Sequence, residues 1–450
     1  MTEPAPSANA APAIMPAALL GGANAVRDLL ALVRRHLDLD VAYVSRLNSE
    51  TCTLCEVDAD ASSPLSRGGP MSRQRHETYC GLVASGVLPQ LMTDTLDHPV
   101  ARGLAVTGEL AIRANISVPV VLSDGTVYGM FCAFSHQPNP ALNERDLNVV
   151  KLFAHLASLS IEAELTADRA AREKRDRLEP YLSGRTPLTM MLQPVWDVTA
   201  EVPFGAEALC RFSGEPKRGP DKWFAEAGEV GLGAQLELAA VRRALETLPY
   251  LPQDSLLMIN ASPETVIDPG FGRMLEGAPF ERLVVEITEH AIVEEYEPLV
   301  KALTPFRHSG LRIAVDDMGG GYASLCHVLK LQPDVIKADM SIVRNIDSDA
   351  SRRAMISAMA GFAAETDTIL LAEGVETAPE LSTLLNLGVD LAQGYFLSRP
   401  VAAETIGDTI DSGLPHGGRA AIDAIAETTR QDNALGALHF PAAPASAAGG

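Results

Sequence analysis

The sequence predicts an α/β protein whose C-terminal half forms a TIM-type β/α barrel, preceded by a smaller α+β domain. Two observations predict the barrel. Eight apolar, strand-like runs alternate with helical patterns between residues 187 and 410, and several of these runs are followed directly by an acidic residue. An open doubly wound sheet would need a glycine-rich phosphate loop after its first strand, and none is present there. A barrel is therefore the expected fold.

The predicted barrel strands are short and rich in Val, Ile and Leu. Amphipathic helical patterns separate them, for example over residues 234–248 and 351–365. In chain order the eight runs are TMMLQPV, FGAEALC, LLMIN, LVVEI, LRIAVD, VIKAD, ILLAE and LAQGYF.

The first domain is expected over residues 21–165. It opens with an amphipathic helical pattern, and a second apolar helical pattern around residues 149–159 closes it. Two hairpins are predicted between them. One joins VAYVSRL to TCTLCEV, and the other joins NISVPVVL to TVYGMFCAF across Ser123-Asp124-Gly125, because Asp-Gly between apolar strands favours a tight turn.

A charged helical pattern over residues 166–186 links the two domains, and Pro180 and Pro187 are expected to end it. Two interpretations stay open: a solvated linker helix, or a helix that pairs with its copy in a homodimer. The terminal segments, residues 1–20 and 411–450, are rich in Ala and Pro and are expected to be disordered.

The composition limits the class of partner. The net charge is −22, from 36 basic and 58 acidic residues, which disfavours binding of duplex DNA or RNA through phosphates. No apolar run approaches the ~18 residues that a membrane span needs, and no signal peptide is recognisable. A cytoplasmic protein is expected, with its six cysteines reduced and mostly buried.

Acidic residues at the predicted strand ends point to a metal site. They are Glu207, Glu286, Asp316, Asp317 and Glu373. Each alone could cap a helix or begin a turn, but together they fall on the face where barrels build active sites. Carboxylates gathered there repel one another unless a cation lies between them.

The neighbouring polar residues narrow the chemistry. An amide at Asn260 together with carboxylates forms an all-oxygen set, which suits Mg²⁺ or Mn²⁺ rather than zinc. Two adjacent aspartates can bridge a pair of ions for attack on a phosphate ester. Lys337 could orient water and offset negative charge, and Arg211 could form a fork with a phosphate.

Residues 187–410 resemble the EAL domain, a family of bacterial cyclic di-GMP phosphodiesterases. The residues EAL are Glu207-Ala208-Leu209, and the stretches LQP, ITE, DD-G-GY-SL, AEGVE and QGY follow the order and spacing of the family. The resemblance implies hydrolysis of cyclic di-GMP to linear 5′-pGpG by water, with two Mg²⁺ or Mn²⁺ ions and no covalent intermediate.

The resemblance also implies a role for each motif residue. One ion would be held by Glu207, Asn260, Glu286 and Asp316, and the second by Asp316, Asp317 and Glu373. Lys337 would contact the catalytic water. Substrate contacts would come from Gln193, Arg211, Asp317, Glu376 and Gln393, and Glu289 would brace the loop after the aspartates.

This loop departs from the family pattern DDFGTGYSSL. Met318 stands in place of Phe, and Gly320 makes a run of three glycines at 319–321, which raises the entropic cost of one loop conformation. No expected metal ligand is lost. The alternative function is a catalytically weak or inactive EAL domain that acts as a cyclic di-GMP receptor.

The first domain resembles a GAF sensory domain through its order of helix, hairpins and strands, with phrases such as VAYVSRL and VPVVLSDGTVYG. GAF domains bind varied small ligands or none, so the resemblance implies a regulatory role without naming a ligand. EAL domains commonly pair, which is the second reason to expect a homodimer.

Overall fold

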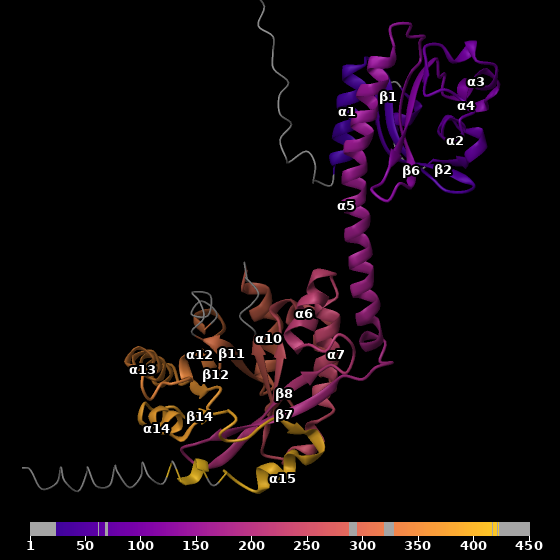
Figure 1. Ribbon diagram of the computed structural model, residues 1–450. Coiled ribbons are helices and arrows are strands. Elements are labelled where there is room, and N and C mark those ends of the chain that lie inside the picture. Colours follow the sequence, from indigo (N-terminus) through magenta and orange to yellow (C-terminus); the bar gives the residue numbers. More distant parts are fainter. Residues whose placement is uncertain are drawn as a thin grey trace, which may run out of the picture. The chain divides into compact units, whose positions relative to one another are not determined.

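The computed structural model describes residues 24–61, 63–67, 71–287, 295–318, 328–415, 417–420 and 422. The chain divides into two compact units, Met1–Ala170 and Ala171–Gly450 (Figure 1), and each is described by itself. This division does not test the domain limits expected from the sequence, residues 21–165, 166–186 and 187–410, which remain predictions.

The first unit is built on one antiparallel sheet with the strand order β3-β2-β1-β6-β5-β4. Its strands are β1 (Val41–Leu47), β2 (Thr51–Ala59), β3 (Ser72–Gln74), β4 (Leu91–Met92), β5 (Ala114–Val121) and β6 (Val127–Ser135). Both expected hairpins form, since β1 pairs with β2 and β5 pairs with β6.

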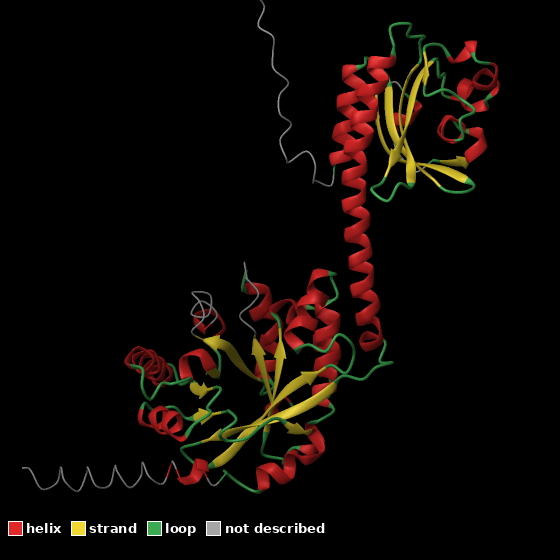
Figure 2. Cartoon of the chain, viewed as in Figure 1, coloured by secondary structure: helices red, strands yellow, loops and turns green. Residues whose placement is uncertain are grey.

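Helices cover both faces of this sheet (Figure 2). They are α1 (Ala25–His36), α2 (Tyr79–Ala84), α3 (Pro99–Gly103), α4 (Ala105–Glu109) and the first part of α5 (Glu144–Leu182). Alternate residues of β1 divide between the two faces. Ala42 and Val44 pack with α1 and α5, whereas Val41 and Tyr43 pack with α2 to α4.

Helix α5 continues through Pro180 and ends at Leu182, so the prediction that Pro180 ends the helix is wrong. A proline inside a helix removes one N–H donor and crowds the preceding turn. Burial of the residues on either side offsets this cost, because Leu178 and Tyr181 both pack into the core of the second unit.

The second unit is an eight-stranded closed barrel, which confirms the predicted fold class. Its strands are β7 (Thr189–Asp197), β8 (Val202–Arg211), β9 (Leu256–Ala261), β10 (Leu283–Ile287), β11 (Arg312–Met318), β12 (Val335–Ala338), β13 (Ile369–Ala372) and β14 (Leu391–Ala392). Pairing of β14 with β7 closes the ring, and the short β15 (Val401–Ala402) adds to β7.

Strand β7 runs antiparallel to both of its barrel neighbours, β8 and β14, whereas β8 to β14 are parallel. The chain between β7 and β8 is too short for a crossover, and a short connection can join only antiparallel strands. The Asp197 carboxylate shapes this turn by accepting hydrogen bonds from the N–H groups of Thr199 and Ala200. The barrel therefore differs from an all-parallel TIM barrel in one strand.

Helices pack around the outside of the barrel. They are the end of α5, α6 (Pro220–Glu229), α7 (Gly233–Leu245), α8 (Pro263–Ile267), α9 (Pro269–Leu275), α10 (Glu297–His308), α12 (Met340–Val343), α13 (Ala350–Glu365), α14 (Ala378–Asn386) and α15 (Ile406–Asp411). Their apolar sides and the outward faces of the strands form the largest core of the protein.

The described cysteines are all unpaired, and Cys52, Cys80, Cys132 and Cys210 are buried, whereas Cys55 is exposed. Cys326 lies outside the described residues. Among the helices that the structure describes, none combines the length and the apolar character that a membrane crossing requires.

Candidate active site

The interior of the barrel has an apolar layer with a polar layer directly above it. The apolar layer contains Met258, Val284, Ala314, Val335, Leu371 and Leu391, one residue from each of six successive strands. Side chains two residues apart along a strand share a face. The polar residues Asn260, Glu286, Asp316, Lys337, Glu373 and Gln393 each stand two positions later. On the reversed strand β7, Gln193 stands two positions before Val195.

Lys337 lies at the centre of the acidic residues. Its Nζ is 2.8 Å from Glu286 Oε2, 3.0 Å from Asp316 Oδ1 and 2.7 Å from Glu373 Oε1. Glu207 Oε1 lies 3.8 Å away. The Lys337 side chain is 1% exposed, so four carboxylates share one ammonium in a largely buried space.

Burial and mutual repulsion shift the protonation of this cluster. Burial opposes the charge on Lys337, but the surrounding carboxylates outweigh it and raise the pKa of Lys337 well above its ordinary value. Burial and repulsion by Glu207 raise the pKa of Glu286, against the effect of Lys337. Burial raises the pKa of Glu373 to about 8. At neutral pH the cluster therefore holds extra protons alongside a charged lysine.

Two amide side chains fix the orientation of Glu207. Asn260 Nδ2 donates to Glu207 Oε1 at 3.0 Å, and Gln393 Nε2 donates to Glu207 Oε2 at 2.9 Å. Since each carboxylate oxygen has a second lone pair, Glu207 keeps acceptor capacity toward the cavity.

The loops after β13 and β14 support each other above the barrel. Val375 N–H donates to Gln393 O at 3.1 Å, and Phe396 N–H donates to Val375 O at 3.0 Å. Gly394 makes this close approach possible, because a Cβ there would lie 2.2 Å from both the N and the O of Val375. The AEGVE and QGY motifs thus form one structural element that carries Glu373, Glu376 and Gln393.

These residues line a cavity of 350 Å³. It brings together seven of the residues expected from the sequence: Gln193, Glu207, Asp316, Lys337, Glu373, Glu376 and Gln393. Gln193 also donates through Nε2 to Ser398 O at 3.1 Å. Glu376, at the rim, forms an ion pair with Arg344.

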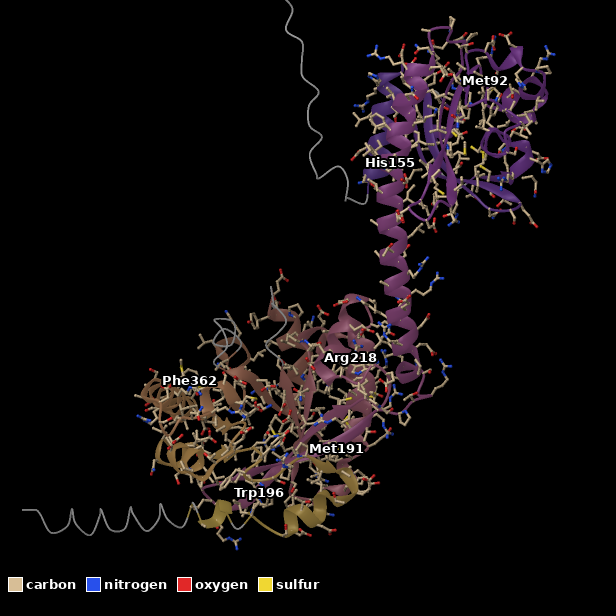
Figure 3. All side chains as sticks on the ribbon, in the orientation of Figure 1. Met92, His155, Met191, Trp196, Arg218 and Phe362 are labelled. Atoms are coloured by element: carbon tan, nitrogen blue, oxygen red, sulfur yellow. The ribbon has the colours of Figure 1, made fainter. Side chains whose placement is uncertain are left out.

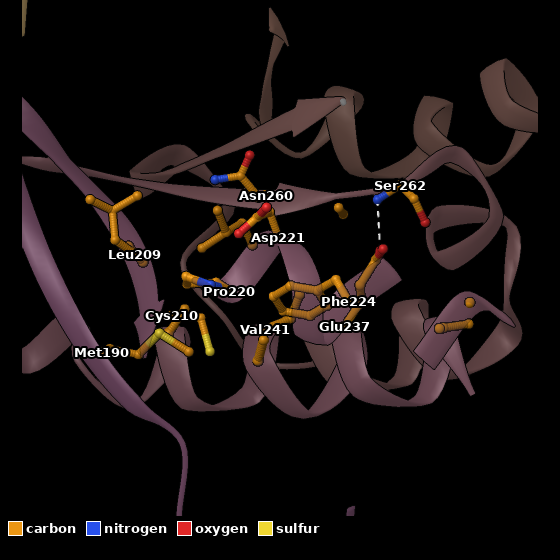
Figure 4. Close-up of a pocket in the computed structure, with 18 of the residues that line it drawn as sticks. Met190, Leu209, Cys210, Pro220, Asp221, Phe224, Glu237, Val241, Asn260 and Ser262 are labelled. Carbon is orange, nitrogen blue, oxygen red and sulfur yellow. Dashed lines mark hydrogen bonds between the residues drawn. The ribbon is translucent and has the colours of Figure 1, made fainter. Parts of the chain in front are cut away.

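A second, larger cavity of 680 Å³ lies between the ends of β8 and β9 and helices α6 and α7 (Figure 4). Arg211 and Asn260 line it, and neither lines the first cavity. Its walls are mostly apolar, with Phe224 and Val241 among them, and Glu237 accepts a hydrogen bond from Ser262 N–H at 2.8 Å. In this structure Arg211 donates to Cys210 O at 2.8 Å rather than to any carboxylate of the cluster.

The donor set fits a hard divalent cation. Its atoms are carboxylate and amide oxygens, the ligands that Mg²⁺ and Mn²⁺ prefer. Glu286 is fully buried, yet its Oε1 has no hydrogen-bond partner among the described residues, and such an acceptor normally has one. No three His, Cys, Asp or Glu side chains of the described residues converge in ligand geometry. Because Lys337 Nζ lies among them, binding of a cation requires the ammonium to move away from some of its partners.

Two expected site residues have no described side chain. Glu289 and the loop glycines 319–321 lie outside the described residues, and only the backbone of Asp317, in β11, is described. Sequence reasoning missed several cavity residues, namely Leu209, Met340, Gly374, Gly394 and Tyr395 in the first cavity and Asp221, Phe224 and Glu237 in the second. Four of them, Leu209, Gly374, Gly394 and Tyr395, stand inside recognised motifs, which was the available signal.

Comparison with protein families agrees with this geometry. Residues 177–400 match the model described as EAL domain, and residues 23–162 match the model described as GAF domain. The chain therefore contains an EAL domain, with a GAF domain ahead of it.

Two curated relatives illustrate the similarity. The probable cyclic di-GMP phosphodiesterase PdeI of Escherichia coli is 30% identical over 229 residues, which cover 48% of this chain and 29% of the relative. An uncharacterised protein of Mycobacterium tuberculosis is 27% identical over 335 residues, which cover 70% of this chain and 52% of the relative. The chain thus spans about half or less of the length of these relatives.

Solved EAL structures are also similar. One is the complex of Klebsiella pneumoniae BlrP1 with manganese and cyclic di-GMP, at 27% identity, a TM-score of 0.44, and 48% coverage of this chain and 56% of that one. Another is the EAL domain of Mycobacterium smegmatis DcpA, at 27% identity, a TM-score of 0.44, and 51% and 99% coverage.

Proposed function

We propose that this protein hydrolyses cyclic di-GMP to linear 5′-pGpG with two divalent cations, Mg²⁺ or Mn²⁺. The observation that carries the proposal is the group of four carboxylates around Lys337 at the base of a cavity. The similarity to PdeI, which is named as a probable cyclic di-GMP phosphodiesterase, supports the choice of substrate.

The charge of the protein explains why cations are needed. The substrate carries two phosphates and the chain has a net charge of −22, so the approach of the substrate is opposed unless positive charge lies at the site. When bound, the ions would neutralise phosphate charge and activate water. We assign Glu207, Asn260, Glu286 and Asp316 to one ion. Asp316, Asp317 and Glu373 are assigned to the other.

The side chains of the chain itself would then act on one phosphodiester. Lys337 stays protonated, and once it has moved away from some of its carboxylates its ammonium can orient water and stabilise charge that develops on phosphorus. Glu373 can accept a proton from that water in its ionised form, which becomes more populated as the pH rises toward its pKa of about 8. The water oxygen bonds to phosphorus, the P–O3′ bond breaks, and the leaving oxygen takes up a proton.

The two cavities suit the two parts of the ligand. The 350 Å³ cavity is lined by charged and amide side chains, whereas the 680 Å³ cavity has an apolar wall and can take a base. Arg211 lines the second cavity beside Asn260, where it can reach a phosphate bound at the shared border. Gln193, Glu376 and Gln393 would contact the substrate from the first cavity.

The proposal is tested with purified full-length protein, cyclic di-GMP and Mg²⁺ or Mn²⁺, with products separated by chromatography. Production of pGpG that is lost in Glu207→Ala and kept in Glu365→Ala is expected, because Glu365 is an exposed glutamate at the end of α13. Tight binding without product would favour the receptor alternative. If the protein neither binds cyclic di-GMP nor forms product, both the proposed function and the receptor alternative are overturned.

We also propose that the protein forms a homodimer through an apolar stripe on α5, composed of Val149, Leu152, Leu156, Leu159 and Ala163. These positions alternate in steps of three and four, the spacing at which two identical helices pack along a seam. Leu152 is 58% exposed and Leu159 is 47% exposed. A second copy of the same helix is the partner that this spacing fits.

We also propose that the GAF domain regulates hydrolysis of cyclic di-GMP, either by binding an unknown small ligand or without a ligand. Comparison of the full chain with residues 171–450 in the hydrolysis assay would give the sign of that regulation. A cytoplasmic location, expected from the sequence, is proposed because the substrate is a nucleotide messenger.

A further inference from the structure

The last turns of α5 contact the segment that follows Arg211. Arg211 ends β8, and the next residue, Phe212, is stacked on Trp223 of α6 with ring centroids 5.1 Å apart and an interplanar angle of 12°. Tyr181 of α5 meets Phe212 edge-on at 5.1 Å and Trp223 at 5.5 Å. Tyr181 is 4% exposed and Trp223 is 1% exposed. The residue beside the expected phosphate ligand is therefore fixed inside an aromatic cluster.

The hydroxyl group of Tyr181 adds a directional contact to the same segment. Gly214 N–H donates to Tyr181 Oη at 2.7 Å. A Cβ on residue 214 would lie 2.5 Å from that hydroxyl oxygen, so only glycine allows this approach. Residues 212 and 214 are thus both held by one side chain of α5.

A partly buried network of ion pairs joins the same elements a second time. Glu226 of α6 accepts from Arg177 Nε of α5 at 3.0 Å and from Arg218 Nη1 at 2.7 Å. Arg218, labelled in Figure 3, also lies over the Trp223 ring at 4.1 Å. Burial tends to raise the pKa of Glu226, but the two arginines outweigh it and lower the pKa. The carboxylate therefore remains charged at neutral pH.

The aromatic cluster reaches the wall of the larger cavity. Phe224 meets Phe212 edge-on at 5.6 Å and lines that cavity together with Arg211. Movement of the Tyr181 ring would therefore change the position of the Arg211 backbone and of the cavity wall together, since packed rings transmit displacement.

We propose that Tyr181 is a positioning residue for substrate binding, which holds Arg211 toward the cavity through Phe212 and Gly214. The role of Arg211 as a phosphate ligand rests on the proposed function. Tyr181 lies on α5, the helix whose N-terminal part packs in the core of the first unit. A change in α5 that moves Tyr181 would therefore alter substrate affinity more than the rate of the chemical step.

The test compares Tyr181→Phe with Tyr250→Phe in the full-length protein. Tyr181→Phe keeps the ring and removes the hydroxyl, and Tyr250 is an exposed tyrosine of the same unit. Hydrogen exchange over residues 211–219 is expected to quicken in Tyr181→Phe alone. The KM for cyclic di-GMP should rise about 2- to 10-fold, the range for loss of one hydrogen bond, with kcat little changed.

A double-mutant cycle separates positioning from general stability. If Tyr181 acts through Arg211, the effect of Tyr181→Phe on KM disappears in an Arg211→Ala background. An equal effect in both backgrounds, or unchanged exchange at residues 211–219, would overturn the proposal. A wild-type protein that neither binds nor hydrolyses cyclic di-GMP would instead refute the proposed function and the phosphate role of Arg211, and exchange would still decide whether Tyr181 holds this segment.

Discussion

Glu207 and Gln393 are 186 residues apart in the sequence, yet Gln393 Nε2 donates to Glu207 Oε2 at 2.9 Å inside the barrel. Closure of the ring by β14 and β7 brings the EAL and QGY motifs together. The glutamate that begins the EAL motif is therefore oriented by the glutamine of the QGY motif, and the site depends on barrel closure.

Replacement of Lys337 by methionine should abolish hydrolysis and destabilise the metal-free protein. Four carboxylates would lose the ammonium that they share, and removal of one partner from a buried ion pair costs about 3–5 kcal/mol. Thermal unfolding in EDTA and in Mg²⁺ measures this. Added Mg²⁺ should raise the Tm of Lys337→Met more than that of wild type. An equal Tm gain in both proteins would contradict competition between Lys337 and the cation, and no gain in either would contradict the cation site.

Replacement of Glu286 by glutamine should stabilise the metal-free protein while removing activity. The raised pKa of Glu286 shows that its charge is disfavoured in the folded state, and an amide of the same shape avoids that cost. A gain in the free energy of unfolding at pH 8 is therefore expected. Urea titration in EDTA gives the value, with the exposed Glu365→Gln as the control. Loss of stability in Glu286→Gln would refute the repulsion described for the cluster.

Stability and activity should respond to pH in opposite directions. The folded-state pKa values of Glu286 and Glu373 are raised, the latter to about 8. The folded protein therefore binds more protons than the unfolded chain above pH ~4.3, and stability falls as the pH rises toward 8. Lys337 contributes nothing to this slope below pH ~10, because it is protonated in both states.

Protons also compete with divalent cations for the same oxygens, so the rate of hydrolysis at limiting Mg²⁺ should increase between pH 6 and about 8. Tm in EDTA and initial rates, recorded over one pH series, check both slopes. Parallel slopes would show that these carboxyls do not bind the cation.

Replacement of Gly394 by alanine should separate the two loops that carry Glu373, Glu376 and Gln393. The new Cβ would lie 2.2 Å from backbone atoms of Val375, which cannot move without breaking the hydrogen bonds between the loops. A loss of at least about 10-fold in kcat/KM is expected from misplaced catalytic groups. Gly361→Ala is the matched control, because Gly361 has open space around it in α13.

Substitutions that introduce negative charge into the apolar stripe on α5 should dissociate the proposed dimer. The double variant Leu152→Glu/Leu159→Glu places like charges at the seam, so light scattering should give the mass of one 47.8 kDa chain. The wild type and Leu96→Glu, a change at an exposed leucine elsewhere on the first unit, should give twice that mass. A monomeric wild type would refute the dimer.

The barrel and its polar interior were predictable because both depend on short-range patterns. Strands of alternating or continuous apolar character ending in Asn260, Glu286 or Lys337 are visible in the sequence, and residue parity then sets which side chains face inward. The reversed direction of β7 also had a signal in its short connection to β8.

Other features depend on contacts between distant segments. The extension of α5 past Pro180 is stabilised by packing of Tyr181 against Phe212 and Trp223. No local sequence pattern predicts this packing. The position of Lys337 between Glu286 and Glu373 likewise depends on the order of β10, β12 and β13 in the closed barrel. Arg211 was expected at a phosphate, and its placement in a separate cavity depends on the packing of α6 and α7.

The apolar layer beneath the polar one allows the acidic residues of the barrel to change during evolution while the fold is kept. Because Met258, Val284, Ala314 and their neighbours close the barrel floor without help from the acids, an acid can be exchanged for a neutral residue without opening the core. Each such exchange would relieve repulsion and make folding more favourable. Loss of one acid by drift would thus leave a folded barrel, so the fold alone does not require Glu207, Glu286, Asp316 and Glu373.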